Sequence, residues 1–186
     1  MKERQAGMLE VDKAVLVVVD VQGRLAEVMF ERALVFANMA RAIRGCKALH
    51  MPVLWLEQNP SRLGRTIAPL RHLLEPAEPI AKMAFSAWGE KRFVDSLVAS
   101  GRRQALLIGI ETHVCVYQTA ADLLQNGYEA HIVADAVSSR SRANREAGLR
   151  STAAAGAGIT TVEMFLFELM RTAEHAAFRE VQKLVR

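Results

Sequence analysis

The sequence is poor in cysteine and has no long apolar run, and each shortage excludes a class of protein. Two cysteines in 186 residues form neither a disulfide framework nor a zinc-binding pattern. The longest wholly apolar run, about Ala14 to Val19, is far shorter than the ~18 residues that a membrane-spanning helix needs. The first residues carry charges but are followed by no apolar segment of secretory type. We therefore expect a cytoplasmic protein without a membrane partner.

The excess of basic over acidic residues is small, and aromatic residues are also scarce. The formal net charge is +4, and aromatic residues make up 6% of the chain. The densest basic group contains no interleaved aromatic side chains and consists of Arg140, Arg142, Arg145 and Arg150. Such a group is typical of a solvated helix face or a subunit contact, so we expect no nucleic-acid partner. No Gly-x-Gly-x-x-Gly follows a predicted strand, which disfavours a nucleotide-dependent oxidoreductase.

What the sequence does contain is a regular alternation of apolar strands and helices. Short apolar or β-branched segments predict strands at 14–19, 53–56, 79–82, 105–108, 128–133 (ending at Asp135) and 159–161. Helical spacing of apolar residues predicts helices at 31–49, 89–99, 112–124, 142–155, 162–170 and 178–185. This order predicts a single α/β domain over 1–186, a parallel sheet covered on both faces, and a loose N-terminal arm over 1–13.

The two cysteines lie in different contexts. Cys46 falls on the apolar stripe of the helix 31–49, which indicates core packing. Cys115 follows the buried strand 105–108, and Thr112 is a plausible N-cap for the helix that contains it. The amide hydrogens at a helix start favour an anion, so the pKa of this thiol can fall from ~8.5 to between ~3.5 and ~7.5. The alternative is a small buried side chain that packs the helix onto the sheet.

Three reactive side chains stand where strands end. Asp20 follows the first strand, Lys82 ends the short third strand, and Cys115 follows the central one. In open α/β sheets, ligands bind outside the carboxyl ends of the strands. A carboxylate can take the thiol proton and later return it, and an ammonium can hold the carboxylate in place. The three residues therefore predict a thiolate nucleophile acting on an acyl-type or imine-type electrophile.

The chain resembles the isochorismatase-like family of cysteine hydrolases over roughly residues 12 to 170. The resemblance is carried by segments in the same order: Val-Val-Val-Asp20-Val-Gln22, Lys82-Met-Ala-Phe85-Ser86-Ala-Trp88, Gly109-Ile-Glu-Thr112-His-Val-Cys115-Val, Gln118-Thr119-Ala120, and the segments 135–140 and 159–164. The resemblance implies a Rossmann-like, three-layer α/β/α fold with a six-stranded parallel sheet.

The resemblance also implies roles for individual residues. Cys115 would be the nucleophile, Asp20 the general base and then acid, and Lys82 the cation that orients them. The bond Ile110–Glu111 would be cis, and the backbone N–H groups of Glu111 and Cys115 would form an oxyanion hole. The implied reaction is cleavage of a small amide or other C–N bond through a thioester.

One departure from the family concerns metal. Metal-dependent nicotinamidases of this family carry an Asp-x-His loop after the second strand, whereas this chain has Glu57-Gln58-Asn59-Pro60. His72 is the nearest later histidine, and a lone histidine on a predicted helix is more often a surface or core residue than a ligand. We therefore expect no metal and no cofactor, and we place the chain with the poorly characterised branch of the family.

Substrate contacts and rival functions complete the expectations. We predict a small-molecule substrate pocket formed by Gln22, Phe85, Trp88, Thr112 and His113, with His113 as pocket wall or subunit contact more readily than as a catalytic partner. The apolar helix 162–170 predicts a homo-oligomer, a dimer or larger. Two alternatives stay open: a binding or scaffold protein without turnover, and an isochorismate-type vinyl ether hydrolase, which would not need the thiol.

Overall fold

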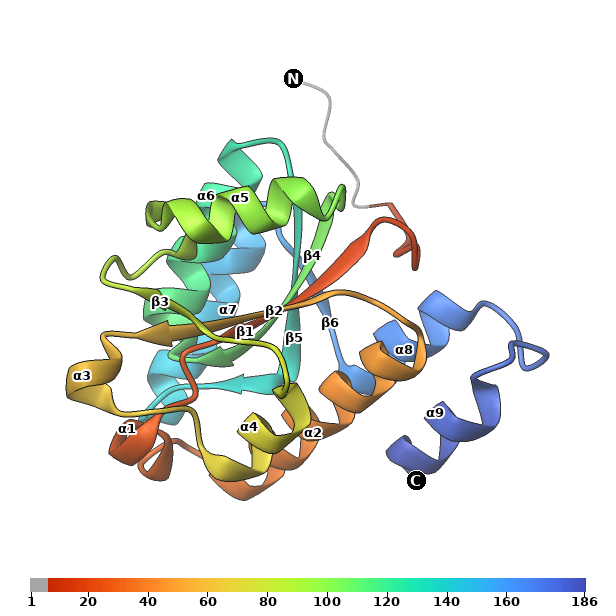
Figure 1. Ribbon diagram of the computed structural model, residues 1–186, viewed down its shortest axis with the longest axis horizontal. Coiled ribbons are helices and arrows are strands. Elements are labelled where there is room, and N and C mark those ends of the chain that lie inside the picture. Colours follow the sequence, from red (N-terminus) through yellow and green to blue (C-terminus); the bar gives the residue numbers. More distant parts are fainter. Residues whose placement is uncertain (1–6) are drawn as a thin grey trace.

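The computed structural model describes residues 7–186 and has a six-stranded parallel sheet between two layers of helices, as the sequence predicts (Figure 1). The strands are β1 (Ala14–Val19), β2 (Val53–Gln58), β3 (Ile80–Lys82), β4 (Gln104–Ile110), β5 (Glu129–Ser138) and β6 (Gly158–Thr160). Their order is β3-β2-β1-β4-β5-β6, and every pairing is parallel. The order reverses between β1 and β4, which is where ligands bind in sheets of this kind.

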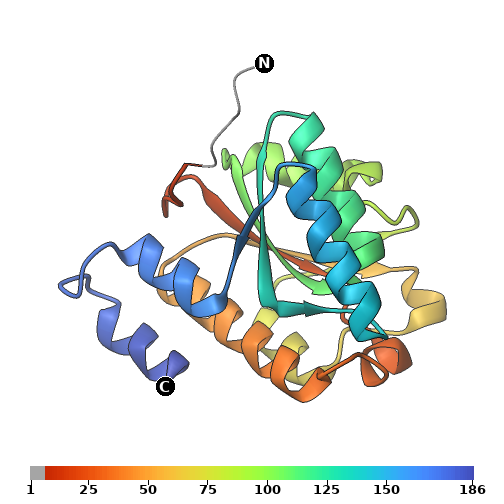
Figure 2. The ribbon, with the colours of Figure 1, turned by 180° about the vertical axis from the view of Figure 1, so that it is seen from behind.

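Helices cover both faces of the sheet, as the opposite views in Figure 1 and Figure 2 show. The face that includes Leu16 and Val18 packs against α2 (Arg32–Ala48), α4 (Ala68–Leu74), α8 (Val162–Met170) and α9 (Phe178–Val185). The face that includes Val15 and Val17 packs against α5 (Lys91–Ala99) and α6 (Tyr117–Gln125), with α7 (Arg142–Ala154) beside them. No helix of residues 7–186 is long and apolar enough to cross a membrane.

The central strands are apolar on both faces. Every residue of β1 and every residue of β4 is buried, because helices cover both sides of a parallel sheet. Short elements connect the carboxyl ends of the strands to the helices: α1 (Gly23–Glu27), α3 (Pro60–Leu63), and the single turns η1 (Ala87–Gly89) and η2 (Thr112–Val116). These turns, together with the strand ends, position the functional side chains.

The N-terminal arm is not loose over its described part, contrary to the prediction. Leu9 is buried, its N–H donates to Glu168 Oε1 over 2.7 Å, and its carbonyl accepts from Arg171 over 2.6 Å. The N–H of Glu10 donates to the Gln104 side chain over 2.9 Å. Apolar burial and these bonds therefore tie the segment to the sheet, and the rest of the predicted arm, residues 1–6, lies outside the described residues.

Three strands extend beyond their predicted ends, and one of them, β4, continues from the predicted 105–108 to Ile110. Glu57 and Gln58, which the sequence predicts in a loop, are the buried last residues of β2. Thr66 donates two hydrogen bonds to the Glu57 carboxylate, and the Gln58 N–H donates to the side-chain oxygen of Gln22, so these polar groups are satisfied inside the protein. β5 likewise continues past Asp135, with a shift of register opposite β4. Polar residues mark a strand end only when no distant partner satisfies them.

Candidate active site

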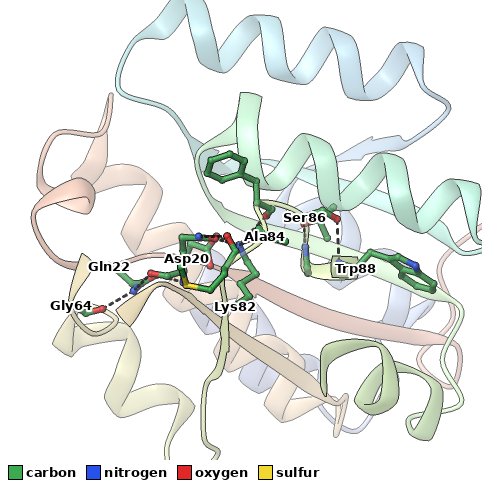
Figure 3. Close-up of polar contacts among 12 residues, drawn as sticks. Asp20, Gln22, Gly64, Lys82, Ala84, Ser86 and Trp88 are labelled. Atoms are coloured by element: carbon green, nitrogen blue, oxygen red, sulfur yellow. Dashed lines mark hydrogen bonds and ion pairs between the residues drawn. The ribbon is translucent and has the colours of Figure 1, made fainter. Parts of the chain in front are cut away.

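Asp20, Lys82 and Cys115 come together at the carboxyl ends of β1, β3 and β4. The Lys82 Nζ atom lies 2.7 Å from Asp20 Oδ2, and Cys115 lies close enough to both for their charges to act on the pKa of its thiol. Both charged side chains are almost completely buried, with exposures of 0% and 2%. Figure 3 shows Asp20 and Lys82 pointing toward one another. The three side chains thus meet beside the point where the strand order reverses.

Backbone geometry at the ends of β1 and β4 brings the side chains of Asp20 and Cys115 close together. Asp20 adopts a left-handed conformation with φ 53°, which is uncommon for residues other than glycine but more frequent for aspartate. Gly109 has φ 127°, and a Cβ atom there would lie 2.1 Å from the carbonyl oxygen of Val19. Glycine is therefore required at this position, because any side chain would push β4 away from the end of β1.

Lys82 is held by a cage of oxygen atoms in addition to Asp20. Its ammonium donates to Gln58 Oε1 over 2.7 Å, to the Phe85 carbonyl over 2.9 Å and to the Ala84 carbonyl over 3.1 Å. A buried charge is tolerated when it is paired and hydrogen-bonded, and this one is both. The cage fixes the ammonium against the carboxylate, so its position does not depend on substrate.

The charges in the site act on the two proton-carrying groups. Burial raises the pKa of Asp20, while the charge and hydrogen bond of Lys82 and the hydrogen bond of Cys115 oppose that rise. Burial and the Asp20 carboxylate raise the pKa of Cys115 to about 12, against a partial opposing effect of Lys82. The predicted lowering of the thiol pKa is therefore wrong: an adjacent carboxylate and lost hydration outweigh the helix start. A thiol with a pKa this high carries its proton at neutral pH.

Thr112 is not the N-cap of the helical segment that contains Cys115, contrary to the prediction. Residues Thr112–Val116 form a π-helical turn, Glu111 occupies the cap position, and no side chain caps the turn. The Thr112 hydroxyl is buried and has no hydrogen-bond partner among residues 7–186. The preceding bond, Ile110–Glu111, is cis. The fully buried Thr112 side chain lines the interior beneath the site and presents no surface to a substrate.

A glycine of α7 lets the π-helical turn pack against that helix. A Cβ atom on Gly148 would lie 2.7 Å from the backbone nitrogen of His113 and 2.8 Å from the carbonyl carbon of Thr112. Real Cβ atoms do not approach backbone this closely. Gly148 therefore determines where the backbone just before Cys115 lies, a role that the sequence pattern of small residues in this helix indicates only in general terms.

His113 is engaged on both ring nitrogens by groups other than the thiol. Its Nδ1 lies 2.9 Å from the Ser139 hydroxyl, and its Nε2 lies 3.4 Å from Glu111 Oε2. The other Glu111 oxygen, Oε1, accepts from Arg140 Nε over 2.6 Å. These contacts hold the imidazole in a wall beside the site, which leaves no ring nitrogen for a Cys–His pair.

Two of the predicted pocket residues have other partners. Gln22 is buried, and its amide group donates to the carbonyls of Gln58 and Gly64 and accepts from the Gln58 N–H, so it braces the end of β2. Trp88 packs edge-on against Tyr128 with ring centroids 5.7 Å apart, and Figure 3 shows it away from Asp20 and Lys82. We therefore no longer expect Gln22 and Trp88 to line the substrate pocket. The Phe85 side chain is 56% exposed and can still contact a substrate.

Sequence reasoning missed two residues that position the site. Gln58 bonds Lys82, and the buried Thr119 hydroxyl accepts the N–H of Ala87 over 2.9 Å. This second bond anchors on α6 the loop whose carbonyls hold Lys82. The sequence signal for Thr119 was its place in the segment Gln118-Thr119-Ala120, which resembles the family, whereas Gln58 lies in the loop that departs from it.

Other predicted features lie away from the site. His72 is an exposed residue of α4, and no group of three or more His, Cys, Asp or Glu side chains suited to a metal ion occurs within residues 7–186. Cys46 is completely buried in the core, as predicted. The predicted basic group is largely paired, since Arg142 contacts Glu146 and Arg145 donates to the carbonyls of Ala134 and Val137.

Known proteins share this fold and much of this sequence. The chain matches the family model described as an isochorismatase domain over residues 14–164. It is 38% identical to isochorismatase domain-containing protein 2 of Danio rerio over 96% of this chain and 90% of that protein. Among solved structures, the MAR1 ribonuclease of Caenorhabditis elegans is 34% identical with a TM-score of 0.90, covering 96% of this chain and 92% of that one.

A more distant structure shares the fold. The YcaC gene product of Escherichia coli, described as an octameric hydrolase of unknown specificity, has a TM-score of 0.87 at 21% identity and covers 98% of this chain and 96% of that one. Family match, sequence identity and fold agree over almost the whole length of the sequence. The chain therefore belongs to the isochorismatase family, whose fold suits a hydrolase.

Proposed function

We propose that the protein is a cysteine hydrolase that cleaves a small amide or other C–N bond through a thioester on Cys115. The observation that carries the proposal is the buried ion pair of Asp20 and Lys82, 2.7 Å apart, whose charges both act on the Cys115 thiol. A carboxylate that is held by a fixed cation beside a thiol can exchange a proton with that thiol without moving far.

In the first half of the reaction, Asp20 accepts the Cys115 proton as the sulfur attacks the substrate carbonyl carbon. The negative charge that develops on the carbonyl oxygen is stabilised by the backbone N–H groups of Glu111 and Cys115. Asp20 then donates its proton to the substrate nitrogen, the C–N bond breaks, and an amine leaves. The enzyme is left as a thioester with an ionised Asp20.

In the second half, Asp20 accepts a proton from water as the water oxygen attacks the thioester carbonyl. The C–S bond breaks, the sulfur recovers its proton from Asp20, and a carboxylic acid leaves. The raised pKa of Asp20 supports this role, because it makes the carboxylate a stronger base toward the thiol proton. Lys82 stabilises the ionised Asp20 carboxylate both in the free enzyme and in the thioester intermediate.

Turnover of a panel of small amides, with mass spectrometry of the quenched enzyme, tests the proposal. We expect a covalent acyl adduct on Cys115 in the wild type, loss of turnover in Cys115→Ala, and full activity in the control Cys46→Ala. The panel should include isochorismate, because of the family, and RNA, because one relative is named a ribonuclease. Turnover of any substrate that survives Cys115→Ala would contradict the thioester route. Absence of turnover across the panel would favour a scaffold role.

We also propose that the protein forms homo-oligomers. The helix α8 is apolar nearly all round, yet two of its side chains, Met164 and Phe167, are 58% and 37% exposed in a single chain. Met83 and Phe85, in the loop after β3, are 70% and 56% exposed. Exposed apolar side chains of this size favour association with another chain. Light scattering should give a mass above the 20.6 kDa of one chain; a particle of 20.6 kDa at micromolar concentration would contradict this.

A further inference from the structure

A cavity lies on the opposite face of the sheet from Cys115. It has a volume of about 460 Å³ and is enclosed by the end of β2, helix α4 and the segment 75–79. Its lining residues are Trp55, Glu57, Pro60, Arg65, Arg71, Glu75, Ala77, Glu78 and Pro79. Trp55 belongs to the core on the α2 and α4 side, whereas Cys115 belongs to the core on the other side. The volume is that of a site for a small molecule.

The floor of this cavity carries a buried carboxylate with one free oxygen. Glu57 is only 4% exposed, and its Oε1 accepts from the Thr66 N–H over 2.6 Å and from the Thr66 hydroxyl over 2.8 Å. Within residues 7–186 no hydrogen bond goes to its Oε2. The Oε2 atom is therefore free to accept a charge-assisted hydrogen bond from a cationic donor inside the cavity.

The rim carries an unpaired cation. Arg65 is exposed, and it takes part in no ion pair among the residues that the structure describes. The other arginine of the cavity, Arg71, lies 3.6 Å from Glu75 and is already paired. Between floor and rim, Trp55, Pro60 and Pro79 provide an apolar wall. The cavity thus has a negative floor, and its rim carries the cation of Arg65 together with the exposed carboxylate of Glu78, which is in no ion pair within residues 7–186.

We propose that this cavity binds a small zwitterion such as an amino acid, with the ammonium on Glu57 and the carboxylate on Arg65. An ammonium supplies the charged donor that Glu57 Oε2 lacks, and a carboxylate matches the two-pronged geometry of a guanidinium. The carbon chain between the two charges packs on the apolar wall. This site is separate from the proposed hydrolytic centre, so the proposal does not depend on turnover at Cys115.

Tryptophan fluorescence provides a local readout, because the chain has two tryptophans and only Trp55 lines the cavity. In a Trp88→Phe background, glycine, γ-aminobutyrate and ε-aminocaproate should be titrated against the cation butylamine and the anion butyrate. We expect at least one zwitterion to give a saturable change and to bind more tightly than either single-charge probe. Circular dichroism should confirm that each variant is folded.

Substitutions at the two ends of the cavity locate the charges. Glu57→Gln keeps an oxygen for Thr66 but removes the charge, and we expect it to weaken zwitterion binding by ~10-fold or more, as for loss of a charge-assisted hydrogen bond. Arg65→Gln should weaken zwitterion binding and leave butylamine binding unchanged. Glu174→Gln and Arg62→Gln, exposed residues outside the cavity, are the matched controls and should bind as the wild type does.

Three outcomes would overturn the proposal. The first is the absence of a saturable Trp55 signal with every probe. The second is butylamine binding as tight as that of the best zwitterion, which would make the site one for plain cations. The third is unchanged affinity in Arg65→Gln; because Arg65 is exposed, this variant keeps the test informative even if Glu57→Gln fails to fold.

Discussion

Replacing Asp20 with asparagine should make Cys115 more reactive toward iodoacetamide while abolishing the proposed hydrolysis. The wild-type thiol is held in its protonated form by burial and by the charge of Asp20. Asparagine keeps the size of the side chain but removes that charge, so burial and the charge of Glu111 are the causes that continue to raise the pKa of Cys115. Lys82 then favours the thiolate without the opposing charge of Asp20.

The structure allows the size of this effect to be worked out. The pKa of Cys115 is raised from 9.0 to about 12, and each unit changes the thiolate fraction tenfold. A like charge at contact distance accounts for ~1–3 units of such a shift. Because a thiolate of lower pKa is also a weaker nucleophile, the alkylation rate rises only about 3-fold per unit. We therefore expect Asp20→Asn to be alkylated roughly 3- to 40-fold faster than wild type at the same pH.

The assay follows alkylation of intact protein by mass spectrometry across a range of pH in a Cys46→Ala background. Asp95→Asn is the matched control, because this exposed residue pairs only with Lys91 on the surface of α5. A real change in pKa moves the pH midpoint of the rate to lower values. Looser packing around Cys115 would instead raise the rate without moving the midpoint. An unchanged or higher midpoint in Asp20→Asn would refute the electrostatic account of the site.

Three further predictions concern stability and geometry. Lys82→Met should lower the free energy of unfolding, measured in urea at neutral pH, by ~3–5 kcal/mol, because the charge of Asp20 is then buried without a partner. The pKa of Asp20 is raised, so this loss should become smaller as acid protonates the Asp20 carboxylate. Gly148→Ala should reduce turnover strongly in steady-state assays, because its Cβ atom would lie 2.7 Å from the His113 nitrogen. Burial lowers the pKa of His131 below its ordinary value of 6.5. The neutral side chain therefore stabilises the fold above pH 6.5, and this contribution is lost as the pH falls. In urea titrations, His131→Gln should show a smaller loss of stability on acidification than the wild type does.

Matched controls separate these effects from general damage. Lys91→Met removes an exposed ion pair of α5 and should change stability little at any pH. A Cβ atom on Gly7 meets nothing within 4 Å, so Gly7→Ala should keep full turnover. His72→Gln, on the surface of α4, should leave the acid side of the stability profile unchanged. Equal behaviour of any variant and its control would contradict the corresponding prediction.

The sequence by itself determined the sheet and the meeting of the three reactive residues. The run Ala14–Val19 predicts a strand buried on both faces because every one of its side chains is apolar, and the structure has that strand at the same residues. Placing Asp20, Lys82 and Cys115 at strand ends then brings them to one edge, because the carboxyl ends of parallel strands meet there. These inferences need only local patterns and the rules of parallel sheets.

Only the tertiary structure decided the electrostatics and the polar partners. The pKa of Cys115 could not be predicted from its helix position, because it depends on a carboxylate from the end of a different strand and on burial by distant segments. Gln22 and Trp88 turned out to contact Gln58 and Tyr128, partners far along the chain. Apolar periodicity is a property of neighbouring residues, whereas hydrogen-bond partners and desolvation depend on what the folded chain places nearby.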